Sequence, residues 1–404
     1  MSSRVAILLL LIALGFGLAN GFNLFFRLAY LLAGVLILGY LWAWVNVHWL
    51  EIAVERRADR LEAGEIAEER LSVSNRSRLP KLWVEVQESS DLPGHYGGRV
   101  VSLSGHQRQT WMIQTRCQQR GPYTLGPITV TSGDPLGLFT MKRTLGGTHG
   151  LLVYPTTVDL PRFEVPAAQL PSEGRLRGHT YHITPNAAGV RDYVPGDSLR
   201  RIHWPSTAHA GKLMVKEFDL ERGSEIWVLL DMQEGVQAGS GEECTEEYGV
   251  TIAASIARKY LLTNHLVGLV SQAERRYFIQ MERGGGQLYR ILDSLAAIRA
   301  RGAVPLNELI LNESVHFGRN TSLVIITPST EMTWVATVQM LTQRGVKACV
   351  VLLEPSTFGG GNGSLLVVSS LASSGIPTYL VKQGEALETA LTSPMGGENA
   401  LIIG

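Results

Sequence analysis

The stretch "SEIWVLLDM" (residues 224–232) is an almost uninterrupted apolar run that ends at an acidic residue, Asp231. Its length and composition are typical of a strand buried on both faces. The next segment, 242–264, repeats apolar residues at helical spacing, and "LVGLVSQ" (266–272) and "RRYFIQM" (275–281) are again strand-like. Working outward from residue 224, the chain therefore alternates buried strands with amphipathic helices, which predicts an α/β domain.

The same alternation continues toward residue 404. Leucine and isoleucine mark one helical face over 287–300, and another helix is expected through Trp334, Val338 and Leu341. The remaining elements are three strands, "TSLVIITP" (321–328), "KACVVLLEP" (347–355) and "GIPTYLVKQ" (375–383), and a short helix, "EALETALT" (385–392). Such a pattern indicates a parallel sheet covered on both faces, so residues 223–404 are predicted to form a doubly wound α/β domain.

Residues 51–155 show short alternating runs without a helical period. Turn formers such as Pro93-Gly94 and Gly146-Gly147 separate these runs. The expected strands are "EIAVERRAD" (51–59), "AEERLSVSN" (67–75), "KLWVEVQES" (81–89), "RVVSLS" (99–104), "TWMIQTRCQ" (110–118), "YTLGPITVT" (123–131) and "LLVYP" (151–155). Short strands at this spacing predict a small β-sandwich.

The first 50 residues contain two long uncharged segments, 5–26 and 28–50, on either side of Arg27. Each is long enough to cross a bilayer as a helix, and a transmembrane helical hairpin is predicted over residues 1–50. Three tryptophans near the end of the second segment fit an interfacial aromatic belt. A cleaved signal peptide ending near "GLANG" (17–21) is the alternative for the first segment.

Arginines set the expected orientation in the cell membrane. Arg56, Arg57, Arg60 and Arg70 follow the second segment, whereas only Arg27 is expected in the turn between the spans. The positive-inside bias then places the soluble domains in the cytoplasm of a multi-pass membrane protein. Three cysteines without a paired spacing fit a reducing compartment.

The stretch "GVRDYVPGDSLRRIHWPSTAHAGKLMVKEFD" (189–219) differs from its surroundings by its mixture of arginine, aspartate, histidine and tryptophan. Pro195-Gly196 suits a tight turn, after which Asp197 can cap a short helical turn. Neighbouring arginines can pair with Asp192 or Asp197, and Trp204 offers a face for a guanidinium. The residues favour a structural hub that locks two domains, in which removal of the Trp204 side chain is costly if the indole is buried.

Catalysis and nucleic-acid binding are less well supported in this stretch. Ser198 or Ser206 beside His203 are the residue types of a nucleophile and its base, but no Gly-x-Ser-x-Gly elbow accompanies them. Residues 173–222 hold eight lysines and arginines against six acidic residues, and the whole chain holds 36 of each, so a basic nucleic-acid surface is not indicated.

A zinc site is not favoured either. His179 and His182 are three residues apart, but no further ligand is spaced to join them. A surface role is the preferred interpretation of the two histidines.

The stretch closely resembles the signature of the bacterial DUF58 (domain of unknown function 58) family. The matching residues are Arg191, Tyr193, Gly196, Asp197, Arg200, Ile202 and Trp204, followed by "AHAGKLMVKEF" (208–218), with "GDPLGLF" (133–139) near the end of the β domain. The resemblance implies a transmembrane hairpin (1–50), a β-sandwich-like domain (51–155), a signature segment (156–222) and a von Willebrand factor A-like domain (223–404). It also implies a membrane-associated protein that acts as partner or adaptor of a MoxR-type AAA+ ATPase.

Von Willebrand A domains can hold a divalent cation where the first strand ends in Asp-x-Ser-x-Ser. Asp231 matches the aspartate, but Gln233 and Gly235 replace both serines, and Pro328 stands where a later aspartate is common. We therefore expect a degenerate ion site in which Asp231 caps a strand end by accepting hydrogen bonds from loop amides. Weak binding through Asp231 and Glu234 is the alternative.

The leading hypothesis is a non-enzymatic, membrane-anchored interaction protein, with no cofactor, no catalytic residues, no nucleic-acid partner and lipid contact through residues 5–26 and 28–50. One alternative is an enzyme with an unrecognised active site near 189–219, or one that uses Cys117 or Cys244. Arginines flank Cys117 and could lower its pKa, whereas the apolar setting of Cys349 indicates a core residue. Another alternative, a metal-dependent surface adhesin, requires the opposite topology and an intact ion site.

Overall fold

The computed structural model describes residues 3–166, 187–194, 202–218, 225–319 and 321–395, and it divides into two compact units. The first unit holds residues 1–157 and 292–299, and the second holds the rest. The strands of the first unit are β1 (Leu50–Arg56), β2 (Arg60–Glu62), β3 (Ile66–Asn75), β4 (Lys81–Ser90), β5 (Arg99–Leu103), β6 (Arg108–Arg116), β7 (Gly121–Gly133), β8 (Thr140–Leu145) and β9 (His149–Tyr154).

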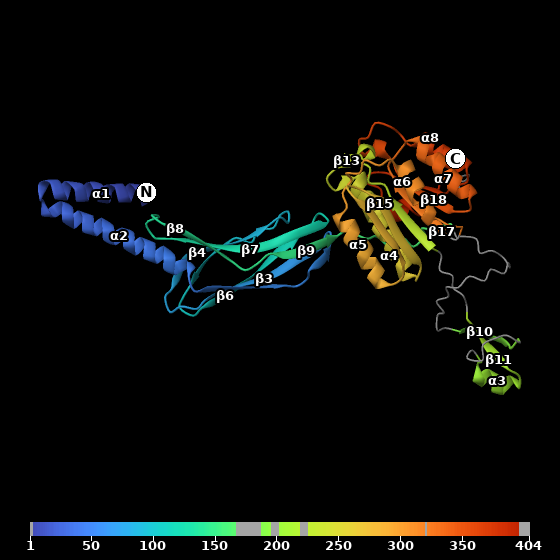
Figure 1. Cartoon of the computed structure of the whole chain (residues 1–404), viewed down its shortest axis with the longest axis horizontal. Helices are drawn as coiled ribbons and strands as arrows, with labels where there is room; N and C mark the ends of the chain where they lie inside the picture. Colours follow the sequence, from blue (N-terminus) through green and yellow to red (C-terminus); the bar gives the residue numbers. More distant parts are fainter. Residues whose placement is uncertain (1–2, 167–186, 195–201, 219–224, 320, 396–404) are drawn as a thin grey trace. The chain divides into compact units, whose positions relative to one another are not determined.

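Two apolar helices open the first unit, α1 (Ser3–Asn20) and α2 (Asn23–Val47), and Figure 1 shows them side by side in blue. Both are long and apolar enough to cross a membrane. The predicted boundary at Arg27 is wrong: the chain turns at Gly21, whose positive φ of 65° favours glycine, and Arg27 lies inside α2. The turn between the helices therefore carries no arginine of its own.

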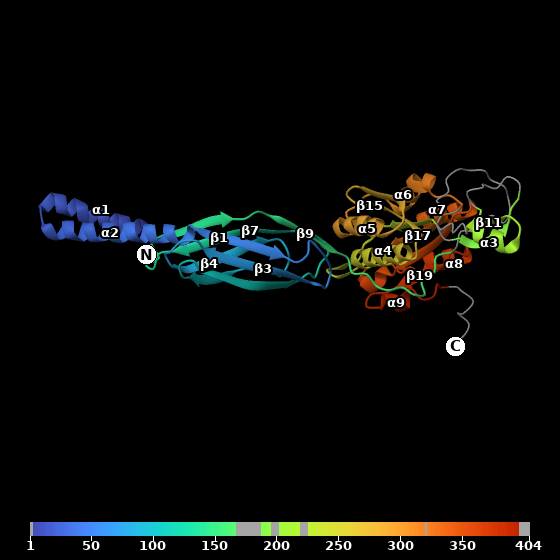
Figure 2. The same cartoon turned by 90° about the horizontal axis from the view of Figure 1, so that it is seen from below.

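The strands of the first unit form two sheets that pack face to face, as predicted for a sandwich. One sheet has the order β1-β3-β6, and the other has the order β2-β9-β7-β4-β5 with β8 paired to β7. Figure 2 shows the strands running alongside one another. Leu71 and Val73 of the first sheet share a core with Val84, Val86 and Val130 of the second. The sequence patterns found every strand of this unit except β2 and β8.

The last turn of α2 belongs to the sandwich core. Val47 packs within the same cluster as Leu71, and only two residues separate it from β1. The side-chain amide of Asn46 donates to Ser132 Oγ at 3.2 Å, and the buried Lys81 ammonium donates to the carbonyl oxygen of Val45. Nearer the start of α2, the ring of Tyr40 packs edge to face with the ring of Phe139, which lies in the loop between β7 and β8. The two ring centroids are 5.8 Å apart.

The second unit contains a six-stranded sheet with the order β16-β15-β12-β17-β18-β19. Its strands are β12 (Glu225–Leu230), β15 (Leu266–Gln272), β16 (Arg276–Glu282), β17 (Thr321–Thr327), β18 (Lys347–Leu353) and β19 (Thr378–Val381). Five strands run parallel, but β16 is antiparallel to β15. The prediction of an all-parallel sheet is wrong at this edge because the short connection 273–275 permits only an antiparallel return.

Helices lie on both faces of this sheet. The helices that follow β12 in this unit are α4 (Thr245–Leu262), α6 (Leu306–Glu313), α7 (Met332–Gln343), α8 (Leu365–Ser373) and α9 (Leu387–Ala390), and α5 (Gly285–Ala297) has residues in both units. Trp227 and Leu229 of β12 face the cluster built by α6, α7 and α8, whereas Leu230 points toward Gly249 of α4. Alternate residues of the central strand are thus buried on opposite faces, as its unbroken apolar run predicts.

The signature segment contributes a small module to the second unit. It consists of a β10 (Ala187–Asp192) and β11 (Met214–Phe218) ribbon and the helix α3 (Trp204–Ala210). The remaining short pairing joins β13 (Gly239–Ser240) to β14 (Glu243–Cys244).

Candidate functional site

Asp231 lies where β12 and β17 end next to each other in the sheet. Its Oδ1 accepts a hydrogen bond from the Gln233 amide at 3.0 Å, and its Oδ2 accepts one from the Thr327 hydroxyl at 2.7 Å. The expected bond from a loop amide is therefore present, and Thr327 adds a partner that the sequence did not predict. Burial raises the pKa of Asp231 to about 6, although both hydrogen bonds favour the charged form.

The other residues of the expected ion site serve the loop. Gln233 precedes a single 3₁₀ turn, Glu234–Val236, which contains Gly235. The Glu234 amide donates to the Gly302 carbonyl at 2.9 Å. Within the described residues, no group of three acidic, histidine or cysteine side chains arranged for a shared metal ion includes Asp231.

The signature residues are placed only in part. Gly196, Asp197 and Arg200 lie outside the described residues, as do Ser198, His179 and His182, and Arg191 is described only through its backbone in β10. Ile202 is buried and Tyr193 is half-buried. Trp204 is 65% exposed, so the condition of a buried indole is not met, because the ring lies at the first position of α3 with its side chain toward solvent.

His203 and Ser206 come together as helix-capping partners. His203 Nδ1 lies 2.7 Å from Ser206 Oγ and accepts from the Ser206 amide at 3.4 Å, which satisfies a free donor at the start of α3. Nearby, Lys212 Nζ donates to Asp192 Oδ2 at 2.7 Å. The histidine–hydroxyl contact thus has a local structural role in folding the signature module.

The cysteines do not support the thiol-enzyme alternative. Cys117 is fully buried, and burial raises rather than lowers the pKa of its thiol, so the expected effect of the flanking arginines is wrong. Burial also raises the pKa of Cys244. Cys349 is a core residue as predicted, and burial raises its pKa to about 12.

The sandwich contains a layer of polar side chains that the sequence patterns did not single out. Glu69 of β3, Glu88 of β4 and His95 of the β4–β5 loop place one ligand atom each within 4.8 Å of one another. Their side chains are 4%, 0% and 2% exposed. The layer separates the core around Leu71 from a second apolar cluster around Cys117.

Arg56 and Thr115 are the hydrogen-bonding partners of this layer. Arg56 Nε donates to Glu69 Oε1 at 3.3 Å, and its terminal nitrogen donates to Glu88 Oε1. His95 Nδ1 lies 3.0 Å from Thr115 Oγ1. Three other atoms, Glu69 Oε2, Glu88 Oε2 and His95 Nε2, have no hydrogen-bond partner.

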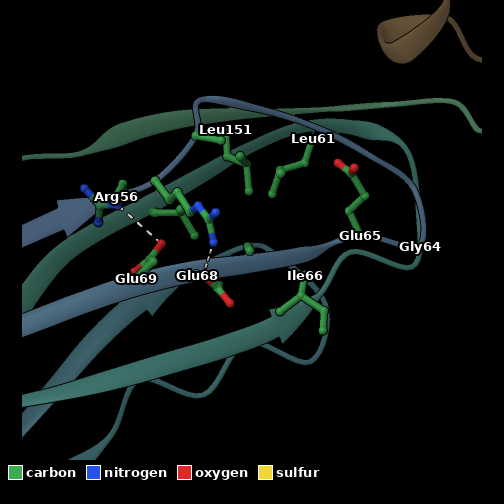
Figure 3. Close-up of a pocket in the computed structure, with 12 residues that line it drawn as sticks. Arg56, Leu61, Gly64, Glu65, Ile66, Glu68, Glu69 and Leu151 are labelled. Carbon is green, nitrogen blue, oxygen red and sulfur yellow. Dashed lines mark hydrogen bonds and ion pairs between the residues drawn. The ribbon is translucent and has the colours of Figure 1, made fainter.

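A cavity of 460 Å³ adjoins the layer. Its lining includes Arg56 and Glu69, and Figure 3 shows the ion pair between them beside the apolar side chains of Leu61 and Leu151. Glu65 and the Arg57–Glu68 pair also line it. The cavity therefore combines charged groups with an apolar wall.

A signal for part of this layer is present in the sequence. In β3 and β4, Glu69 and Glu88 occupy the same alternating positions as the buried Leu71 and Val86. A glutamate in the inward phase of a strand predicts a buried carboxylate. The approach of His95 depends on tertiary folding of its loop and has no such signal.

Comparisons with known proteins cover parts of the chain. Uncharacterized protein YeaD of Bacillus subtilis (strain 168) is 26% identical over 230 residues, which cover 56% of this chain and 55% of that protein. Uncharacterized protein Rv1480 of Mycobacterium tuberculosis (H37Rv) is 25% identical over 133 residues, covering 31% of this chain and 41% of that protein. The chain thus spans about half the length of the curated relatives it matches.

Two solved structures align with about a quarter of this chain each. The CARDB domain of PF1109 from Pyrococcus furiosus aligns with a TM-score of 0.20 at 17% identity, covering 26% of this chain and 86% of that domain. The C-terminal domain of wzt aligns with a TM-score of 0.22 at 9% identity, covering 27% of this chain and 75% of that domain.

The family model described as "Protein of unknown function DUF58" matches residues 189–351, from the signature module into β18.

Proposed function

We propose that this protein is a membrane-anchored interaction protein without enzymatic activity, which presents its signature module and α/β domain to a protein partner in the cytoplasm. The observation that carries the proposal is the exposed apolar surface of the signature module. Trp204 is exposed, and Val194 and Leu213 of the same module are exposed as well. Exposed tryptophan is a frequent anchor of protein interfaces because it buries a large area with little loss of conformational freedom.

The proposed partner is a MoxR-type AAA+ ATPase, as the family resemblance implies. The α/β domain is proposed to be von Willebrand A-like, which the strand order β16-β15-β12-β17-β18-β19 supports. A resident cation is not part of the proposal, because both carboxylate oxygens of Asp231 are engaged by Gln233 and Thr327. The apolar helices α1 and α2 are proposed to span the cell membrane.

The alternative is an enzyme with its site near residues 189–219. The contact between His203 and Ser206 favours it, since a histidine beside a hydroxyl is the arrangement of a base and its nucleophile. The capping role of the same contact accounts for it without catalysis, so we prefer the interaction protein.

A capture experiment tests the proposal. The detergent-solubilised full chain is purified from its own cells with and without ATP, and bound proteins are identified by mass spectrometry. We expect an AAA+ ATPase of the MoxR type with the wild type, and its loss with Trp204→Ala. The matched control is Trp83→Ala in β4, because Trp83 is 60% exposed on the other unit. Equal capture by both variants, or no ATPase with the wild type, would refute the proposal.

A further inference from the structure

Three polar atoms lie close together inside the sandwich without a hydrogen bond: Glu69 Oε2, Glu88 Oε2 and His95 Nε2, the last two at an ion-pair distance of 3.6 Å. A buried polar atom without a hydrogen bond destabilises the folded protein, so three of them together indicate a ligand that bonds to all three. Two carboxylates and one imidazole are a donor set for a metal ion. We propose that Glu69, Glu88 and His95 bind a divalent transition-metal ion of the Zn²⁺ or Mn²⁺ class.

The spacing of the donors fits such an ion. His95 Nε2 and Glu88 Oε2 are 3.6 Å apart, and all three ligand atoms lie within 4.8 Å of one another. Around an ion with bonds of about 2.0 to 2.2 Å, tetrahedral neighbours are separated by about 3.4 Å. Binding therefore needs only small side-chain movements, because the ligands already converge from two strands and a loop.

Outer partners already orient the ligands. Arg56 donates hydrogen bonds to the other oxygen of each carboxylate, Oε1 of Glu69 and Oε1 of Glu88. When His95 donates its Nδ1 proton to Thr115 Oγ1, its Nε2 carries the free lone pair that a metal requires. Hydrogen bonds of this kind to the far side of a ligand are characteristic of protein metal sites.

The charge balance favours a cation. Among the described residues, the two carboxylates share one guanidinium, that of Arg56, and the His95 imidazole lies at ion-pair distance from Glu88. The imidazole ligand favours Zn²⁺ or Mn²⁺ over Mg²⁺ and Ca²⁺, which prefer oxygen donors alone.

The site is closed on one side and borders a cavity on the other. A Cβ atom at Gly97 would lie 2.8 Å from Cβ of Glu88 and 3.2 Å from His95 Nε2, so this loop packs directly against the ligands. On the other side, Glu69 and Arg56 line the 460 Å³ cavity. Of the three proposed ligands only Glu69 lines this cavity, so the cavity borders the site on the Glu69 side.

The first test is metal binding by the wild-type full chain, purified in detergent without a histidine tag and stripped with a chelator. We expect calorimetry to show one high-affinity site for Zn²⁺ or Mn²⁺, with Mg²⁺ bound at least tenfold more weakly. X-ray absorption of the Zn²⁺-loaded protein should show only nitrogen and oxygen ligands, with one imidazole. No stoichiometric binding by the wild type would overturn the proposal and leave the two carboxylates sharing a proton.

Variants then locate the site. Glu88→Gln and His95→Gln, which keep the side-chain size, should each weaken Zn²⁺ binding at least a hundredfold, and Thr115→Val should weaken it about 10- to 100-fold. The matched control is Glu68→Gln, since Glu68 neighbours Glu69 but pairs with Arg57 instead. Binding that survives in Glu88→Gln and His95→Gln, or that falls equally in Glu68→Gln, would overturn the assignment. Circular dichroism of each variant separates lost binding from lost folding.

Discussion

Asp231 and Thr327, 96 residues apart in the chain, are joined by a 2.7 Å hydrogen bond at the point where two central strands end side by side. The bond ties the loop after β12 to the loop after β17, where Ser329 in turn donates its amide to Thr327 Oγ1 at 2.9 Å. A buried carboxylate therefore holds together the edge of the sheet at which α/β proteins usually bind ligands.

This carboxylate should make the stability of the second unit depend on pH. Its folded pKa of about 6 lies above the ordinary value, so its contribution to stability is complete below about pH 4 and is lost as the pH rises through 6. Asp231→Asn cannot ionise, so the variant should lack the loss of about 3 kcal/mol that the wild type undergoes between pH 4 and pH 8. Hydrogen exchange of β12 and β17 peptides, compared between the two proteins at each pH, measures this. A constant difference across pH would contradict it.

Millimolar Mg²⁺ should not stabilise the second unit, because Gln233 and Gly235 replace the hydroxyl ligands of an intact ion site. An ion present at a hundred times its dissociation constant would add about 2.7 kcal/mol, which hydrogen exchange in β12 would detect. A protection that appears with Mg²⁺ and vanishes in Asp231→Ala would show that the site is functional after all.

A reporter fused after Gly404 should be active only as a cytoplasmic fusion. Arg4 begins α1 and Arg56 and Arg57 follow α2, so these charges lie at the same end of the hairpin, whereas Arg27 lies near the opposite end. The control is a fusion at Phe22 in the turn between the helices, which should report the opposite side. Periplasmic activity of the Gly404 fusion would contradict the proposed topology.

Trp204→Ala should leave stability nearly unchanged, within about 0.5 kcal/mol, because the indole is mostly exposed. Ile202→Ala, at a buried position in the same module, should cost about 2 to 5 kcal/mol. Urea unfolding of the detergent-solubilised chain, followed by hydrogen exchange of α3 and β11, compares the two variants. A large loss with Trp204→Ala would restore the interpretation of this stretch as a structural hub.

Arg276→Ala should destabilise the edge of the α/β sheet. Arg276 binds the buried Glu313 with two hydrogen bonds of 2.7 and 2.8 Å, and its removal leaves that carboxylate without its main partner, at a cost of about 1 to 3 kcal/mol. Hydrogen exchange of β16 and α6 provides the measurement. Arg301→Ala, which breaks an ion pair exposed on both sides, is the control and should show no measurable change. Equal effects would contradict the role of burial.

The sequence pattern predicted the architecture because the sandwich strands alternate between buried and exposed residues, whereas the central strands of the α/β sheet are buried along their whole length. Periodicity did not identify α8. Leu365 and Leu366 are exposed on this helix, and its buried positions are apolar as well, so the two faces are not distinguished by polarity. The helix α6 was missed although Leu306, Leu309 and Ile310 follow helical spacing. The polar layer was partly readable from the phase of Glu69 and Glu88 in their strands, but the return of His95 onto them depends on the fold of a loop.

The junction between α2 and the sandwich has a mechanical consequence. Val47 lies in the sandwich core, and hydrogen bonds of Lys81 and Asn46 join the end of α2 to β4. The connection between α2 and the sandwich is therefore rigid. The contact of Tyr40 with Phe139 braces the helix at a second level. In a membrane, α2 and the sandwich would change their tilt together as one rigid body. A force that a partner applies to the sandwich would therefore reorient the two apolar helices as well.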